Sequence, residues 1–374
     1  MERFDIVIVG GGIAGASLGA ELVGRASGTA RRVLLIEAEA IPGMHSTGRS
    51  AAFWLESYGG PGVVALSTAS HEFLSSPPAD FAEQGFLRAR GAIHVDTSGR
   101  ADAFAHLPES VETRPMSRGE LDATVPGLSP RFVQALEEPG CADIDVAELH
   151  AAYLRQFRRG GGAVRTDSRL IAAVRSDDVW TIRLEDESSV EAGVLVNAAG
   201  AWADLVADAA GRAPIGIAPK RRTMVQLRVG RSGIARMPQL LDAAGSFYFK
   251  GETDHSVWVS PHDEIACLPC DAQPEEIDIA VAIDRFERAV DWSVERVERS
   301  WAGLRSFAPD RLPVYGYDSG ERDFFWFAGQ GGFGIQTAPA AAKLAAALLT
   351  GEAPDPMIAQ IDPASYAPTR FTTR

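Results

Sequence analysis

The strongest constraint on the fold is a glycine-rich turn between a short buried strand and a helix. Residues 4–9 form an apolar, β-branched run, and Gly10 opens the sequence Gly-Gly-Gly-Ile-Ala-Gly, after which small and apolar residues follow at helical spacing to Leu22. A second apolar run, residues 32–37, ends in an acidic residue. A strand, glycine turn, helix, second strand and terminal acid in this order are typical of a βαβ unit that binds a dinucleotide.

Each residue of this motif has a mechanical reason to be what it is. Gly10 permits the tight turn, Gly12 lets the backbone approach a pyrophosphate, and Gly15 lets the helix press on the sheet. Glu37 is expected to bind ribose hydroxyls. A purely structural crossover would not need three unbranched positions plus an acid, so the motif predicts a nicotinamide or flavin dinucleotide.

The composition excludes several other classes of protein. A net charge of −14 repels phosphate backbones and anionic lipids, so nucleic acid is not an expected partner. Three cysteines are too few for a disulfide framework, and the pair Cys267 and Cys270 lacks further ligands at zinc-finger spacing, so no metal is expected. No basic leader or long uncharged apolar run is present, which predicts a soluble, cytoplasmic protein without an integral membrane segment.

Two long stretches, at about 75–139 and 214–299, lack the rhythm of a parallel sheet and indicate an inserted domain. In them we expect alternating apolar residues at 92–95, neighbouring strands at 247–250 and 257–260, and a helix at 277–290. The other expected elements are a helix over 146–157 behind an Asp145-x-x-Glu148 cap, a strand from Val164, a hairpin of 180–184 with 190–198, a strand at 324–328 and a helix at 335–349.

Two further segments have the chemistry of a dinucleotide site. Residues 45–52 offer Ser and Thr hydroxyls and Arg49 to a pyrophosphate, at the expected start of an Ala-rich helix. The glycine loop 329–334 is expected to bring a helix N-terminus whose positive end would stabilise the anionic edge of a reduced flavin. Because the chain has a single nucleotide motif, a flavin bound here would have to be reduced by the substrate itself.

Six sequence blocks resemble the D-amino acid oxidase superfamily, and most closely its D-arginine dehydrogenase branch of FAD-dependent D-amino acid dehydrogenases. Beyond the nucleotide unit they are HSTGRSAAFW (45–54), NAAGAWAD (197–204), PKRR (219–222), SFYFK (246–250), WAGLRSF (301–307) and GQGGFGIQT (329–337). The resemblance spans nearly the whole chain and keeps the family's order. It implies an α/β fold with a Rossmann-like FAD-binding domain of the GR2 type and an inserted α+β substrate domain built on an antiparallel sheet.

The resemblance also implies how the chain divides and which residues bind FAD. The FAD-binding domain is expected at 1–80, 136–212 and 302–374, and the substrate domain at 81–135 and 213–301. FAD should be noncovalent, because neither 305–313 nor the run after Thr47 carries the Cys or His that attaches flavin in sarcosine-oxidising relatives. The expected FAD-binding residues are Gly10, Gly12, Ala14, Gly15, Glu37, Ala38, Ser46, Thr47, Gly48, Arg49, Ser50, Ala51, Ala52, Leu170, Ala199, Gly200, Gly331, Gly332, Phe333, Gly334, Ile335 and Gln336.

For the substrate, the resemblance implies an amino acid held by its carboxylate. Arg305 and Arg222 would form the clamp, with Tyr248 and Tyr58 bonding the carboxylate and shielding the flavin from water. The carbonyl of Gly332 would accept from the substrate amine. The implied reaction is hydride transfer from Cα to flavin N5, which gives an imino acid that water hydrolyses to a keto acid and ammonia.

The departures from the arginine-preferring enzymes concern the side-chain pocket. Ala92 stands where those enzymes have an acid that holds the substrate guanidinium, and Phe53 and Leu55 replace more polar residues. An unpaired cation in an apolar pocket is costly, so we predict a preference for uncharged D-amino acids over D-Arg. If D-Arg were nevertheless preferred, Glu56 or Glu83 would have to supply the anchor.

Other functions compete with this interpretation. A sarcosine or glycine oxidase type of enzyme would share the fold and the cofactor, and a flavoprotein subunit of an electron-transferring complex would act only with a partner chain. A noncatalytic FAD-binding protein is disfavoured by the joint presence of Arg222, Arg305 and Tyr248. The preferred side chain, the electron acceptor (oxygen or a quinone), the oligomeric state and the role of Cys267 and Cys270 stay open at this point.

Overall fold

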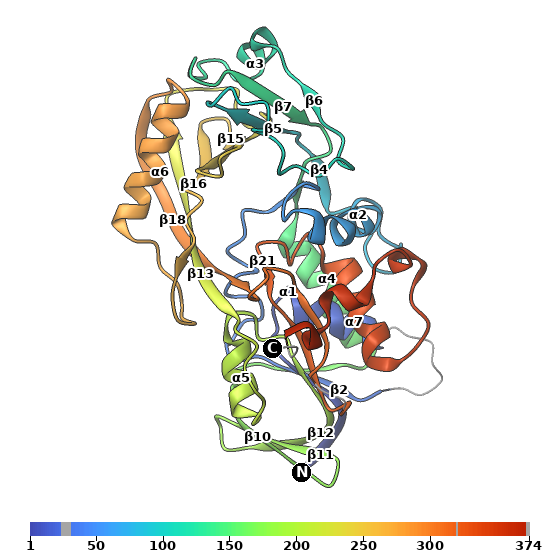
Figure 1. Ribbon diagram of the computed structural model, residues 1–374. Coiled ribbons are helices and arrows are strands. Elements are labelled where there is room, and N and C mark those ends of the chain that lie inside the picture. Colours follow the sequence, from blue (N-terminus) through green and yellow to red (C-terminus); the bar gives the residue numbers. More distant parts are fainter. Residues whose placement is uncertain (24–30, 319–320, 372–374) are drawn as a thin grey trace.

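The computed structural model describes residues 1–23, 31–318 and 321–371, so the parts of the expected FAD-binding domain at 24–30, 319–320 and 372–374 lie outside the described residues. Two large sheets dominate the described chain (Figure 1). Helices α1, α4 and α7 gather on the first sheet, whereas β5, β7 and β15 lie at the opposite end of the molecule. The mixed α/β architecture confirms the predicted fold class.

The first sheet contains the predicted βαβ unit. Its strand order is β10-β11-β12-β1-β2-β9, with β20 beside β12 and β19 beside β20. The central strands are parallel, and β2 and the second half of β1 are apolar and buried on both faces, as expected for strands that helices cover. The strands are β1 (Glu2–Val9), β2 (Val33–Ile36), β9 (Ala163–Arg165), β10 (Leu170–Ser176), β11 (Val179–Leu184), β12 (Ser189–Asn197), β19 (Val314–Tyr317) and β20 (Phe324–Ala328).

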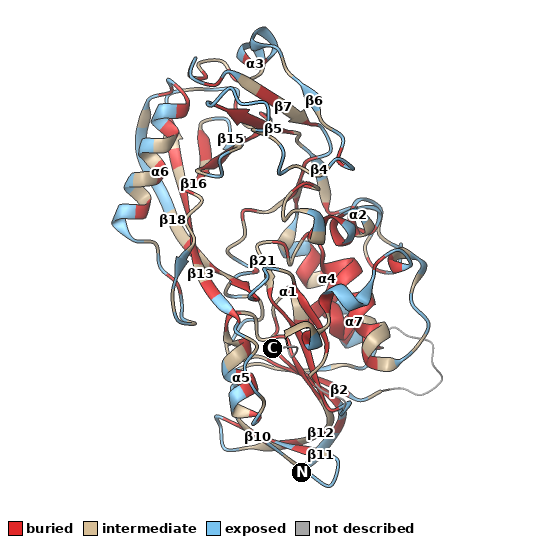
Figure 2. Cartoon of the chain, in the orientation of Figure 1, coloured by how far each residue is buried: buried red, intermediate tan, exposed pale blue. Residues whose placement is uncertain are grey.

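Small residues let the helices pack tightly on this sheet, and Figure 2 shows their inner faces as buried. Gly19 of α1 lies against the Phe157 ring of α4, where an added Cβ would come within 3.1 Å of a ring carbon. The Ala-rich α7 packs on α1 and α2 in the same core. The helices are α1 (Ile13–Val23), α2 (Pro61–Ser75), α3 (Arg118–Thr124), α4 (Val146–Arg159), α5 (Ala203–Ala209), α6 (Glu276–Ala289) and α7 (Ala338–Thr350), with 3₁₀ turns at Gly200–Trp202, Pro356–Ile358, Pro363–Tyr366 and Pro368–Phe371.

The second sheet is built mainly from the two stretches that were expected to form the inserted domain. Its order is β21-β18-β13-β16-β15-β14-β5-β7-β6, with β17 beside β13. The long strands β13 and β18 pair antiparallel from Ala218–Phe307 to Val229–Val294 and reach the first sheet. The strands are β5 (Ala92–Asp96), β6 (Arg114–Pro115), β7 (Gln134–Glu138), β13 (Ala218–Val229), β14 (Gln239–Asp242), β15 (Tyr248–Thr253), β16 (Ser256–Ser260), β17 (Ile265–Ala266), β18 (Val294–Phe307) and β21 (Gln330–Gly331).

The helix expected from residue 45 onward is wrong. Residues 41–49 form turns, and the chain then enters a small sheet of β3 (Phe53–Trp54), β8 (Ala142–Ile144) and β4 (Leu87–Ala89). Ala52 has φ 56°, its amide donates to Ser50 Oγ at 2.9 Å, and its carbonyl accepts from Ile144 N at 3.0 Å. Pairing with β8 therefore overrides the helix propensity of the alanines.

Most other expected elements are confirmed. The strand at 324–328, the hairpin β11–β12, the neighbours β15 and β16, and helices α4 and α6 form where the sequence predicts them. Asp145 caps α4 by accepting from Glu148 N at 3.0 Å. The helix expected from residue 335 begins at Ala338, and the expected alternation at 92–95 is wrong, since every residue of β5 is buried.

Candidate active site

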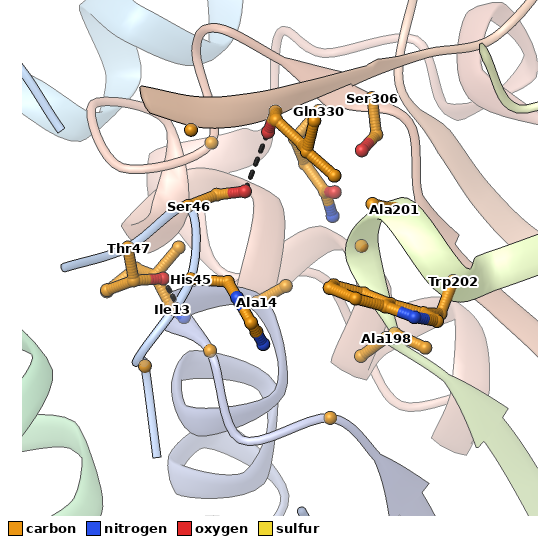
Figure 3. Close-up of a pocket in the computed structure, with 18 of the residues that line it drawn as sticks. Ile13, Ala14, His45, Ser46, Thr47, Ala198, Ala201, Trp202, Ser306 and Gln330 are labelled. Carbon is orange, nitrogen blue, oxygen red and sulfur yellow. Dashed lines mark hydrogen bonds between the residues drawn. The ribbon is translucent and has the colours of Figure 1, made fainter. Parts of the chain in front are cut away.

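A cleft of about 470 Å³ runs from the glycine turn of β1 to the paired strands β13 and β18. Figure 3 shows part of its wall, with Ser46 and Thr47 on one segment, Trp202 on another, and Ser306 and Gln330 on the paired strands β18 and β21. Residues from both large sheets therefore line one continuous cavity. The lining segments are 9–14, 36–39, 43–51, 168–171, 198–209, 303–306 and 330–336 (each in part), with Phe53, Arg222, Met224 and Tyr248.

The three motif glycines are required for two different reasons. A Cβ on Gly10 (φ 107°) would come within 2.5 Å of Ala198 O, and one on Gly15 within 1.9 Å of Gly10 O, so the packing of the chain itself excludes side chains there. A Cβ on Gly12 would meet only Thr47 Oγ1, at 3.3 Å. The protein does not need glycine at this position, which therefore fits a cleft where a ligand takes the space.

The end of β2 presents polar groups to the cleft. Glu37 accepts from Gly11 N at 2.7 Å through Oε2 and from Glu39 N at 2.9 Å through Oε1, which fixes its carboxylate at the cavity wall. His45 pairs through Nε2 with Glu39 Oε1 at 2.9 Å, while its buried Nδ1 has no hydrogen-bond partner in the described chain. An orphaned polar atom beside a fixed carboxylate fits a polar cofactor rather than an empty apolar crevice.

The segment around Ser46 is tied to β18 by side chains that were expected to face a pyrophosphate. Ser46 Oγ donates to Leu304 O at 2.6 Å, and Arg49 Nη1 donates to Ala272 O at 2.8 Å and to Ala302 O at 3.1 Å. Arg49 also pairs with Asp271. The Arg49 guanidinium is thus largely paired within the protein, and Arg49 joins the segment 45–52 to the second sheet.

The structure brings most of the expected FAD-binding residues to this one cleft. Those that line it are Gly10, Gly12, Ala14, Glu37, Ala38, Ser46, Thr47, Arg49, Ser50, Ala51, Leu170, Ala199, Gly200, Gly331, Gly332, Gly334, Ile335 and Gln336. Gly15, Gly48, Ala52 and Phe333 are not among the lining residues. Gly15 and Gly48 allow close backbone contacts, Ala52 forms the turn before β3, and Phe333 packs on Phe307 and Tyr58.

Several lining residues were not predicted from the sequence, and Trp202 and His45 are two of them. Trp202 follows the NAAGA segment, and its ring lies 4.7 Å from the His45 ring, centroid to centroid. Both side chains project into the cavity in Figure 3. Each belongs to a sequence block that had been singled out for its small or hydroxyl residues. The sequence therefore indicated the two segments but not these two side chains.

Arg222 and Arg305 lie on one face of the second sheet at the inner end of the cleft. Arg222 pairs with Gly303 across β13 and β18, which makes Arg305 its diagonal neighbour on the same face. Arg222 Nε donates to Asp263 O at 2.6 Å and Nη2 to Glu264 Oε1 at 3.3 Å, but its buried Nη1 has no partner in the described chain.

Arg305 has no ion-pair partner among the described residues. Its Nη1 donates to Tyr58 Oη, and its guanidinium carbon lies 5.5 Å from the centre of the Tyr58 ring. Gly332 presses on the same group, since a Cβ there would lie 2.8 Å from Arg305 Nη1. The acidic residues among the described lining residues, Glu37 and Glu39, lie at the other end of the cleft, next to β2. The end that contains Arg222 and Arg305 therefore has guanidinium groups but no carboxylate among its described lining residues.

The two tyrosines sit differently around these arginines. Tyr248 lines the cleft, its hydroxyl contacts Met224 Sδ at 3.3 Å, and burial raises its pKa. Tyr58 is not among the lining residues but lies behind Arg305. Burial acts to raise the pKa of Tyr58, yet Arg305 and then Arg222 outweigh burial and leave that pKa below its usual value.

His262, which the sequence did not single out, completes this cluster. Its Nδ1 is 2.6 Å from Gly245 O, and its Nε2 is 3.3 Å from Tyr58 Oη. Burial first, and then the charges of Arg222 and Arg305, lower the pKa of His262 to about 3. The residue lies in the loop after β16, outside every recognisable motif, so only the fold brings it to the site.

The side wall of the inner end is apolar. Phe53, Met224 and Tyr248 line it, and Leu55 and Ala92 are fully buried directly behind them in the same cluster. Glu138, which pairs with Ala92 across β5 and β7, is bonded by Ser57 Oγ at 2.6 Å and by His94 Nε2 at 2.8 Å. Neither Glu56 nor Glu83 is among the lining residues.

The fold and the cleft together define a dinucleotide-binding oxidoreductase. The sequence profile of the DAO family, described as FAD dependent oxidoreductase, matches residues 5–348, and the chain belongs to that family. Its cofactor is FAD. Among the described residues, no group of His, Cys, Asp and Glu is arranged to hold a metal ion, and no helix has the length and apolar character needed to cross a membrane.

Comparison with known proteins identifies several relatives. The glycine oxidase of Pseudomonas putida is 26% identical over 332 residues, which cover 82% of this chain and 83% of that protein. The structure of L-proline dehydrogenase from P. horikoshii superposes with a TM-score of 0.83 at 22% identity and covers 99% of this chain and 98% of that one. Glycine oxidase from Geobacillus kaustophilus gives a TM-score of 0.80 at 21% identity, with 97% and 98% covered. At these identities, the two structural matches show a shared fold.

Replacement of Gly12 by Val should give a folded but colourless protein. The added side chain meets little of the protein but occupies the space next to the turn that the cofactor needs. Visible flavin absorbance per mole of protein should be lost, whereas the circular dichroism spectrum should be kept. Gly15→Ala is the matched control with the opposite expectation, since its Cβ would collide with Gly10 O and lower the unfolding temperature. A yellow Gly12→Val protein would contradict this role.

FAD should leave the protein when the chain is denatured. Cysteine is absent from the described residues that line the cleft, and the histidine there, His45, is held by Glu39. Acid precipitation of the purified protein should therefore release the yellow chromophore into the supernatant. Colour that stays in the pellet would show a covalent link and refute the noncovalent assignment.

Proposed function

We propose that this protein oxidises amino acids at the carbon that bears the amine, with uncharged D-amino acids as preferred substrates. The observation that carries the proposal is the inner end of the cleft. Among the residues that the structure describes, Arg305 has no ion-pair partner and the buried Arg222 Nη1 has no hydrogen bond. Buried guanidinium donors are costly unless an anion meets them. The α-carboxylate of an amino acid supplies the planar pair of oxygens that such donors suit.

The chain's own residues would bind and orient the substrate. Arg305 and Arg222 hold the carboxylate, and Tyr248 covers the site against water. The carbonyl of Gly332, next to Arg305, accepts from the substrate amine and so sets the direction of Cα. FAD, held along the rest of the cleft, supplies a two-electron acceptor for the hydride of Cα. The imino acid product then hydrolyses in water to a keto acid and ammonia.

The apolar wall supports an uncharged side chain. Phe53, Met224 and Tyr248 offer no carboxylate to a substrate guanidinium or ammonium, and the nearby Glu138 is already bonded by Ser57 and His94. A cationic side chain would have to lose water without gaining a partner. Leucine, methionine and phenylalanine side chains carry no hydrogen-bond donor that would lose its partner on entry, so they fit the wall best.

A second candidate function differs from the first in the chirality and the size of the substrate. The D-configuration is supported by the resemblance of the six sequence blocks to the D-arginine dehydrogenase branch. Oxidation of glycine or of a small secondary amine is supported by the relative in Pseudomonas putida, which is named glycine oxidase and matches over most of both chains. Anaerobic bleaching of the flavin by D- and L-amino acids, glycine, sarcosine and proline separates these substrates without assuming oxygen, a quinone or a partner subunit as acceptor.

Replacement of Arg305 by Met should lower kcat/KM for an amino acid by about a hundredfold or more. A charge-assisted bidentate contact and the alignment it gives are worth at least about 3 kcal/mol. Flavin binding should survive, as judged by visible absorbance. Arg296→Met, on the exposed part of the same strand β18, is the matched control and should behave as wild type. Near-normal kcat/KM in Arg305→Met would place the carboxylate clamp elsewhere.

The enzyme should prefer D-Met, D-Leu or D-Phe to D-Arg when kcat/KM is compared under one acceptor and one pH. The absence of a lining acid at the inner end costs D-Arg roughly 1 to 3 kcal/mol, or about 10 to 200-fold. A higher kcat/KM for D-Arg than for all three uncharged substrates would overturn this prediction. Bleaching by glycine or sarcosine with no response to larger D-amino acids would favour the second candidate.

A further inference from the structure

A chain of hydrogen bonds runs behind the proposed carboxylate clamp. It links Arg305 of β18, Tyr58 after β3, His262 after β16 and Gly245 before β15. The Tyr58 and His262 ring centroids are 6.4 Å apart, and Tyr248 packs edge-on against His262 at 5.7 Å. Four separate segments thus meet in one chain of hydrogen bonds. Of its members, Arg305 lines the cleft, and so does the neighbouring Tyr248.

The donor and the acceptor of each hydrogen bond in this chain follow from the groups at its two ends. Gly245 O can only accept, so His262 Nδ1 carries the proton of that 2.6 Å contact. Arg305 can only donate, so the oxygen of Tyr58 accepts from it. If His262 is neutral, its Nε2 is a bare acceptor, and the hydroxyl of Tyr58 donates to it across 3.3 Å.

Burial first, and then the charges around it, keep His262 neutral. Arg222 on β13 and Arg305 on β18 both disfavour a third cation, whereas Glu264 acts in the opposite direction and is already paired with Arg222. A pKa of about 3 leaves His262 uncharged throughout the neutral and alkaline range. Tyr58 is faced by the same two arginines and by Tyr248 of β15. Burial acts to raise the pKa of Tyr58, but the two arginines outweigh burial and leave this pKa below its usual value.

We propose that His262 is a positioning residue, which holds the hydroxyl proton of Tyr58 so that the Tyr58 oxygen aims Arg305 at the substrate carboxylate. The proposal rests on the proposed function, because it takes a carboxylate as the ligand of Arg305. It assigns Tyr58 to the support of Arg305, in place of the direct bond to the carboxylate expected from the resemblance. His262 is not among the residues that line the cleft, and its hydrogen bond to the Tyr58 hydroxyl is its link to Arg305.

This arrangement makes carboxylate binding sensitive to alkaline pH. A neutral Tyr58 leaves the charge of Arg305 for the ligand, whereas a Tyr58 phenolate would pair with Arg305 and compete with the carboxylate. Because the bond to His262 stabilises the neutral phenol, its loss should lower the pKa of Tyr58. The alkaline loss of binding should then begin at lower pH.

The test measures the Kd of benzoate for the FAD-bound protein between pH 6 and pH 10.5 through perturbation of the flavin absorbance bands. Wild type should bind with a Kd that rises at alkaline pH, and Tyr58→Phe should lack this rise. His262→Leu, which fills the space without an acceptor, should shift the rise down by about 0.5 to 1 pH unit. His262→Gln, whose side-chain oxygen can accept, should restore the wild-type profile. His255→Leu, on the partly exposed turn before β16, is the control and should match wild type.

The outcomes separate this inference from the function on which it rests. No benzoate binding by wild type at any pH would overturn the carboxylate site and both proposals with it. Binding with an unshifted rise in His262→Leu, or a rise that persists in Tyr58→Phe, would overturn the role of His262 alone.

Position 262 has φ 55°, so the Leu and Gln variants share the same backbone strain. If both unfold, ¹⁵N NMR of histidine-labelled wild type decides: a proton fixed on Nδ1 with no titration above pH 5 supports the proposal, and titration near pH 6.5 overturns it.

Discussion

Arg222 and Arg305 lie on one face of a sheet, and no carboxylate among the described lining residues stands beside them. These two guanidinium groups determine the chemistry of the inner end of the cleft. Ion desolvation costs several kcal/mol unless hydrogen bonds replace the lost water. Arg222 recovers part of this cost from Asp263 O and Glu264 and keeps one buried donor free. Arg305 recovers less, through the hydroxyl and ring face of Tyr58. The rest of that cost is left for a ligand to offset.

The position of the arginines depends on the register of two long strands. Arg222 and Arg305 are diagonal neighbours only because β13 pairs with β18 in the observed alignment, and a slip by one residue would send one of them to the opposite face. Strand β18 also brings the proposed carboxylate clamp next to the glycine loop, because β21 pairs with Ser306 and Phe307. Arg49 also joins the segment 45–52 to β18 through its hydrogen bond to Ala302 O. One pair of strands therefore connects the glycine-rich end of the cleft to the end where we propose that the substrate binds.

The parts of the fold that could be predicted from sequence are those whose causes are local. The βαβ unit follows from apolar periodicity and from glycines whose neighbours exclude a Cβ, and the strand at 324–328 follows from its unbroken apolar run. The segment after Thr47 was mispredicted because alanine propensity is local, whereas the pairing of β3 with β8 is made by residues about ninety positions away. His262 was missed for the same reason, since nothing near it in sequence indicates that Tyr58 will be its neighbour.

The side-chain pocket shows why substrate identity is harder to derive than the cofactor. Ala92 suggested a missing anchor, yet it lies behind the wall and not in it, so its meaning depends on what surrounds it. A carboxylate is in fact close by on β7, but Ser57 and His94 engage Glu138 and leave the apolar face of Phe53, Met224 and Tyr248 to the cavity. The proposed preference for an uncharged side chain thus rests on which polar groups behind the wall are already hydrogen-bonded. A count of acidic residues in the sequence does not reveal which carboxylates are already bonded.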